Sequence, residues 1–226
     1  MSSIGEVIAS ARRDRGNGLS APIVVLLGTL VILAAAFFIY YVPHYLLQFN
    51  QASYDVYWPR RFGLLPHLFG GTLALLTGPL QLWTGLRRQY PRFHRWTGRV
   101  FLLGVSIGVC GAIYLAFTTT FGWAYGAGLL GLATAWVATT GMAYYAIRSR
   151  DIHAHRRWMI RAYTVTFAFV TARVFDDWLP LPQSGSNIRL VNDIWVSWAV
   201  PLLVVVVVQG MLEISSRSKP ASRHAS

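Results

Sequence analysis

Six runs of apolar residues dominate this sequence of 226 residues. A helix needs about 20 predominantly apolar residues to cross roughly 30 Å of hydrocarbon. The runs reach that length near residues 22–42, 64–83, 100–119, 123–147, 158–179 and 194–212. Only 12% of the residues are charged, against about 25% in ordinary soluble domains. A lone strand in lipid would leave its backbone groups unpaired, so the sequence predicts an all-α integral membrane helix bundle with six transmembrane helices.

Polar segments flank a single transmembrane domain. Residues 1–20 carry three arginines among Ser and Gly, and we expect them to form a disordered cytoplasmic tail. Residues 21–213 form the six-span domain, and residues 214–226 form a second cytoplasmic tail. The first run is longer than the apolar core of a signal peptide, which is about 7 to 15 residues. We therefore interpret it as a retained span.

The cations are distributed unevenly between the two sides that six spans define. Loops rich in Lys and Arg stay in the cytoplasm. With the N-terminus inside, fifteen of the twenty cations fall on the inner side and three on the outer side. The inner ones are Arg12, Arg13, Arg15, Arg87, Arg88, Arg92, Arg95, Arg99, Arg148, Arg150, Arg156, Arg157, Arg217, Lys219 and Arg223. The sequence therefore predicts that both termini are cytoplasmic.

The net charge of +12 raises nucleic acid as a partner. Phosphate backbones are bound by Lys and Arg clustered on one accessible face. Here the cations are divided among the segments between apolar runs, and membrane topology explains that placement. We expect the partners to be the lipid bilayer and its anionic headgroups on the cytoplasmic side, with no nucleic acid.

Small residues indicate close helix contacts. Gly104 and Gly108 form a GxxxG pattern, and Ala127, Gly131 and Ala135 repeat the same spacing in the next run. Helices in lipid pack closely through such residues. Since the connection near residues 118–122 is very short, we expect the third and fourth spans to be antiparallel neighbours.

Two inner connections carry related words, RRQYPRFHRWTGR and RSRDIHAHRRWMIR. Each places a His beside Arg, with Trp two or three residues later, where a span begins. Duplicated helical hairpins would produce such a pair. The requirements of topology and of the membrane interface would produce it too, and the sequence alone leaves both explanations open.

The histidines lie at two depths. His94, His153 and His155 fall near the inner side, whereas His67 and His44 fall near the outer side. Imidazole is a usual axial ligand of haem iron. We therefore consider His94 and His155 as inner ligands and His67 as an outer ligand of b-type haem.

Arginines near the inner histidines fit the same hypothesis. Arg95, Arg157 and Arg161 are candidates to pair with haem propionates, since Arg binds carboxylates well. The competing interpretation is that His, Arg and Trp at these positions anchor the protein at the headgroup level. The sequence contains no CxxCH, which excludes covalent c-type haem, and it has no Walker A, HExxH, CxxC or GxSxG motif.

Three words together resemble a bacterial membrane-protein family of unknown function. They are GPLQLW at Gly78–Trp83, HRWTGRVF at His94–Phe101 and HRRWMIRAYTVTFAFVTAR at His155–Arg173. The resemblance implies several spans in a bacterial cytoplasmic membrane and supplies no reaction. Likeness to cytochrome b561 or ferric-reductase bundles is looser and concerns architecture alone.

Two functions remain open from the sequence. The first is a b-type cytochrome-like protein that transfers electrons across the membrane, with His94, His155 and His67 as iron ligands. The second is a non-redox bundle in which Arg95, Arg157 and Arg161 bind lipid headgroups or a small solute. The sequence identifies neither a redox partner nor a quinone.

Overall fold

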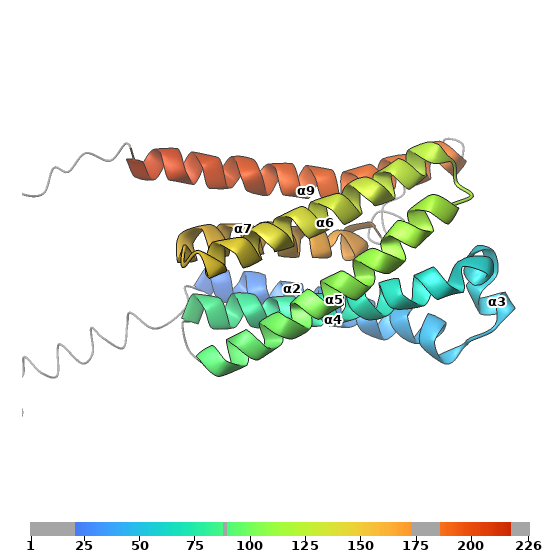
Figure 1. The fold of residues 1–226 in the computed structure, drawn as a ribbon, viewed down its shortest axis with the longest axis horizontal. Coiled ribbons are helices and arrows are strands. Elements are labelled where there is room, and N and C mark those ends of the chain that lie inside the picture. The colour runs from blue at the N-terminus through green and yellow to red at the C-terminus, as the bar shows by residue number, and fades with distance from the viewer. Residues whose placement is uncertain (1–20, 88–89, 173–185, 218–226) are drawn as a thin grey trace, which may run out of the picture.

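The computed structural model describes residues 21–87, 90–172 and 186–217. Its elements are α2 (Ala21–Leu47), α3 (Gln51–Tyr54), η1 (Asp55–Arg60), α4 (Arg61–Arg87), α5 (Pro91–Thr118), α6 (Trp123–Arg148), α7 (Ile152–Thr166) and α9 (Ser186–Arg217). No strand occurs among these residues. The chain is an all-α bundle whose long helices lie side by side along the long axis of the molecule (Figure 1).

Five of the described helices are long and apolar enough to cross a membrane. They are α2, the continuous helical stretch that ends with α4, and α5, α6 and α9. Of the predicted span 158–179, α7 covers residues up to Thr166, and the chain is again helical at residues 168–172. The rest of that span, and the predicted tails 1–20 and 218–226, lie outside the described residues.

The helices extend further than the apolar runs. α5 begins at Pro91, nine residues before the predicted start of its span, because proline suits the first helical position and the polar word that follows continues the helix. α9 runs from Ser186 to Arg217, so the helix continues through residues 214–217, the first part of the predicted tail 214–226. The words HRW and HRRW consequently lie on helices, in the first turns of α5 and α7.

Glycines hold α5 against α4. A Cβ added at Gly70 would lie 2.3 Å from the backbone nitrogen of Gly108 and 2.4 Å from the carbonyl oxygen of Gly104. A Cβ at Gly111 would lie 2.4 Å from the carbonyl oxygen of Gly63. The GxxxG residues therefore pack mainly on the second span, α4. The third and fourth spans are neighbours as expected, since a Cβ at Gly126 of α6 would lie 2.8 Å from the carbonyl oxygen of Ala116.

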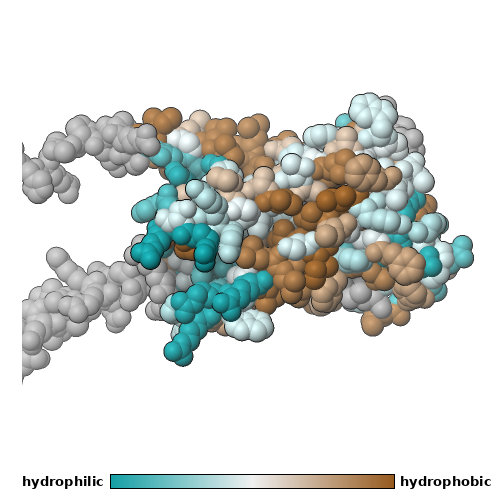
Figure 2. All heavy atoms as spheres, in the orientation of Figure 1, coloured by the Kyte–Doolittle hydropathy of each residue, from teal (hydrophilic) through white to brown (hydrophobic). Residues whose placement is uncertain are grey.

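The small residues of α6 serve a different contact from the one expected. A Cβ at Gly131 would lie 3.0 Å from the ring of Trp198 and 3.5 Å from that of Trp195, both on α9. The core between the helices centres on Trp136, which is 1% exposed and donates a hydrogen bond of 2.8 Å to Thr166 Oγ1. α2 and α9, by contrast, expose many large apolar side chains. Apolar surface forms a broad band across the middle of the molecule, and hydrophilic residues gather at the inner helix ends (Figure 2).

Candidate functional site

Two hairpins bring the inner histidines to the same end of the bundle. His94 is the fourth residue of α5, and His155 is the fourth residue of α7. Each helix follows a residue in the left-handed region, Tyr90 with φ 58° and Arg150 with φ 61°. The hairpins α4–α5 and α6–α7 therefore place a histidine in equivalent positions, as duplicated hairpins would.

The imidazole of His94 is fixed by the helix that precedes it. Its Nδ1 lies 2.8 Å from Thr84 Oγ1, and that hydroxyl donates its own proton to the carbonyl of Leu80 at 2.7 Å. Because the hydroxyl has a single proton, its bond to Leu80 favours the tautomer in which Nδ1 of His94 is the donor to Thr84 Oγ1. A neutral His94 then keeps the lone pair of Nε2 free.

Two further bonds anchor the same turn of α5 to α4. The side-chain amide of Gln81 donates 2.7 Å to the carbonyl of His94 and also binds Thr97 Oγ1. Gln81, Thr84 and Thr97 are all buried. A buried amide and hydroxyl with satisfied hydrogen bonds hold the His94 backbone and ring in one orientation.

The imidazole of His155 is also fixed by a hydrogen bond to the preceding helix, but with a different acceptor. Its Nδ1 lies 2.8 Å from the carbonyl oxygen of Ala143 on α6. A carbonyl only accepts, so Nδ1 is again the donor and Nε2 again carries the lone pair. Asp151 begins α7 by accepting a hydrogen bond of 2.8 Å from the amide of Ala154.

The two imidazoles face each other across the hairpins. Their ring centroids lie 6.4 Å apart, and their planes cross at 83°. Since Nδ1 of each ring is already bonded to the protein, Nε2 is the nitrogen that is left for a ligand. Of the predicted ligands, His94 and His155 are the pair that the structure brings together.

A cavity of about 1210 Å³ opens beside this pair. That volume is larger than most ligand sites, which measure about 300–1,000 Å³. Most of its lining is apolar; α4 and α7 contribute the most residues, and α2 and α9 add side chains such as Leu27 and Val205. Gln81, Thr84, Tyr163 and the two histidines supply polar groups.

The arginines divide between two faces of α7. Arg156 lines the cavity, as do Arg95 and Arg150, and Arg156 donates 3.3 Å to the carbonyl of Gly85. Arg157 and Arg161 instead point to α9, where they bind Glu213 and Gln209. Of the predicted arginines, only Arg95 lines the cavity. Arg156 was not among the predicted arginines, although it lies three and seven residues before Met159 and Tyr163, on the same face of a helix.

His67 occupies a different environment. It is 8% exposed in α4, its Nδ1 lies 3.0 Å from the carbonyl oxygen of Gly108, and its ring contacts that of Phe169 with centroids 4.7 Å apart. The side chain of His44 lies outside the described residues. The role of His67 as an outer iron ligand stays a prediction.

The chain belongs to a family of membrane proteins. The family model described as a predicted membrane protein (DUF2306) matches residues 64–217. This match covers both hairpins and α9. No curated protein and no solved structure matches the chain.

Proposed function

We propose that this DUF2306 protein binds one b-type haem at the inner end of its bundle, with His94 and His155 as the axial ligands, and that it carries electrons. The facing of two imidazoles, each with Nδ1 already bonded, is the observation that supports the proposal. Ligand histidines characteristically donate their second ring nitrogen to a carbonyl or similar acceptor, which fixes the ring and the tautomer.

The spacing of the rings fits two ligands on one iron. With metal–imidazole bonds of about 2 Å and about 1.2 Å from Nε2 to the ring centre, two imidazoles that held one iron from opposite sides would have centroids roughly 6.4 Å apart. The observed separation is 6.4 Å. Two rings on one axis are free to rotate about it, so the crossing angle of 83° is compatible with this arrangement.

The surroundings suit a porphyrin better than a bare metal ion. Among the described residues no group of three or more His, Cys, Asp and Glu gathers to hold a metal, whereas structural zinc sites use about four protein ligands. A porphyrin supplies the remaining four nitrogens itself. The apolar lining fits its macrocycle, and Arg95, Arg150 and Arg156 offer guanidinium groups to its propionates.

The ligand pattern favours electron transfer over catalysis. Haem supplies one-electron chemistry when bound. If His94 and His155 both held the iron, the two side chains would occupy the positions that a substrate or another ligand would need. Transfer across the whole bilayer would need a second centre nearer the outer side, for which His67 is the residue that the sequence offers.

We also propose the membrane setting that the charges favour. The histidine end faces the cytoplasm of a bacterial inner membrane, both termini lie on that side, and anionic headgroups surround its arginines. A protease-accessible tag at the C-terminus should be cleaved in inside-out vesicles and protected in right-side-out vesicles. The opposite pattern would reverse the orientation.

An absorption spectrum of the purified protein tests the haem. We expect a Soret band, with sharpened α and β bands on reduction, and about one iron per chain, the stoichiometry of one bis-histidine site. His94→Ala and His155→Ala should each remove these bands. His153→Ala is the matched control, because this exposed histidine lines the same cavity and should leave the bands unchanged. A colourless wild-type protein from haem-supplemented cells would refute the proposal.

A further inference from the structure

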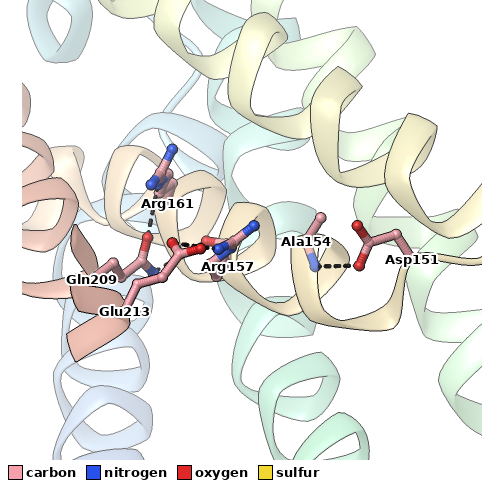
Figure 3. A network of polar contacts seen from close by, with 6 residues as sticks. All are labelled: Asp151, Ala154, Arg157, Arg161, Gln209 and Glu213. Carbon is pink, nitrogen blue, oxygen red and sulfur yellow. Dashed lines mark hydrogen bonds and ion pairs between the residues drawn. The ribbon is translucent and has the colours of Figure 1, made fainter. Parts of the chain in front are cut away.

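A second polar cluster joins α7 to α9 (Figure 3). Arg157 Nη1 lies 2.7 Å from Glu213 Oε2. Arg161 Nε donates 2.8 Å to Gln209 Oε1, and the amide of Gln209 donates 3.3 Å to the carbonyl of Arg157. Gln209 therefore fixes Arg161 to the helix turn that carries Arg157.

The guanidinium of Arg161 retains unused donors. Arg has five N–H donors in a planar fork, and the described residues provide an acceptor only for the one on Nε. Its carbon lies 4.5 Å from the ring centre of Trp158, which supports the plane from one side. In Figure 3 the terminal nitrogens of Arg161 point away from Gln209 and Glu213. The fork is thus held in place and open on its outer edge.

The cluster carries excess positive charge. Arg157 and Arg161 contribute two positive charges, and Glu213 contributes one negative charge. Arg157 is bonded to Glu213, and Arg161 is bonded to Gln209, which lies one turn before Glu213 on α9. Arg161 is only partly exposed, and an unpaired guanidinium close to lipid is costly. An anion with at least two acceptor oxygens would supply the missing charge and acceptors.

The position favours an acceptor from the bilayer. Arg161 lies nine residues into α7, which is about 14 Å along the helix, and Gln209 lies eight residues from the end of α9, which is about 12 Å. A helix of 32 residues spans about 48 Å, slightly more than the roughly 40–45 Å of a bilayer with headgroups. Arg161 therefore lies near the boundary between headgroups and hydrocarbon.

Apolar side chains surround the cluster at this depth. Val208, Met211 and Leu212 are exposed on α9 beside Gln209 and Glu213, and Ile160 is exposed on α7. These side chains would contact acyl chains while the arginine fork contacts a phosphate. Arg forms charge-assisted hydrogen bonds with phosphate oxygens through two nitrogens at once.

We propose that Arg161, oriented by Gln209 and Trp158 and next to the Arg157–Glu213 pair, binds the phosphate of an anionic phospholipid from the inner leaflet. The site is separate from the haem cavity, whose lining includes neither Arg157 nor Arg161. The two proposals can therefore fail independently.

Native mass spectrometry of the detergent-purified full chain, titrated with phosphatidylglycerol or phosphatidylcholine, tests the site. We expect wild type to retain phosphatidylglycerol in preference. Arg161→Gln should weaken this binding about tenfold, the effect of losing one charge-assisted contact. Arg92→Gln is the control, because Arg92 is an exposed inner arginine on α5 outside the cluster and should have no effect.

Two further variants separate binding from a structural role. Glu213→Gln removes the competing carboxylate, so it should tighten phosphatidylglycerol binding several-fold. Arg161→Lys keeps the charge and loses the fork, so its affinity should fall between wild type and Arg161→Gln; it also serves if the glutamine variant fails to fold. Unchanged lipid binding in Arg161→Gln and Arg161→Lys would overturn the proposal. So would displacement of the lipid by equimolar inorganic phosphate, which would identify a soluble anion as the ligand.

Discussion

The inner histidine pair and His67 share one hydrogen-bonding pattern and differ in everything around it. All three rings bond through Nδ1, to Thr84, to the carbonyl of Ala143 and to the carbonyl of Gly108 respectively. His94 and His155 face each other beside a large cavity, whereas His67 is buried at the glycine-rich crossing of α4 and α5. A fixed tautomer therefore prepares a histidine for ligation, but an opposing ligand and free space decide whether ligation is feasible.

Removing a ligand should have the largest effect on the inner region. In His94→Ala or His155→Ala we expect iron to fall from about one per chain to near zero, because each variant loses one of the two side chains that would hold the iron. Metal analysis of the purified variants, normalised to protein, measures this. Retention of iron with an unchanged spectrum in both variants would remove the distinction between the inner pair and His67.

Filling the cavity beside His94 and His155 should lower the iron content nearly as much as removing one of them, although both histidines remain. A Cβ at Gly85 would lie 3.5 Å from His94 Cε1 and meets nothing closer, so Gly85→Leu should fold and occupy the cavity. We expect iron content to fall at least tenfold, since cores tolerate little added volume. Gly141→Leu is the control because Gly141 is exposed on α6 and a Cβ there meets no atom within 4 Å. Equal iron in the two variants would show that the cavity is not the binding space.

Loss of the partner of His94 should have an intermediate effect. Thr84→Val keeps the shape and removes the hydroxyl that accepts from Nδ1. Outer partners of metal ligands contribute about 10–100-fold in affinity, so haem retention during competition with apomyoglobin should shorten by about that factor. Thr164→Val removes another cavity hydroxyl and should leave retention unchanged. Equal retention in both would mean that the ring needs no fixed tautomer.

Replacing His67 should change stability and leave iron unchanged. His67→Ala breaks the contact with Phe169 and leaves the carbonyl of Gly108 without its partner, which costs on the order of 3 kcal/mol. Thermal unfolding in detergent should therefore occur at a lower temperature, with about one iron per chain retained. If wild type holds two irons and the variant one, His67 is a ligand too and the comparison is wrong.

Much of the fold follows from local properties of the sequence. Apolar length predicts the helices that cross the membrane, since each must bury a continuous run in lipid. The related words at His94 and His155 are compatible with duplicated hairpins, which the sequence left as one of two explanations, and each histidine is the fourth residue of its helix. These features depend on residues close together in the chain.

The features that the sequence did not reveal depend on distant residues. The glycines at 104 and 108 have several candidate partners, and their contact with Gly70 is set by how α4 and α5 cross. The cavity combines side chains from α2, α7 and α9, which no local pattern connects. The prediction of Arg157 rather than Arg156 beside the histidines is a different case. Consecutive residues of a helix point in different directions, so the period of α7 could have separated these two arginines from the sequence alone.

Each hairpin carries one histidine that is already oriented by its own two helices. In a membrane, helices first insert and then associate. Each newly inserted hairpin would therefore carry one oriented histidine, which could not form the two-histidine site by itself. Iron bound by both histidines would stabilise only the associated bundle, by mass action. Haem would therefore bind only after the hairpins had associated in the bilayer. A shortage of haem would leave the hairpins free to separate and be degraded.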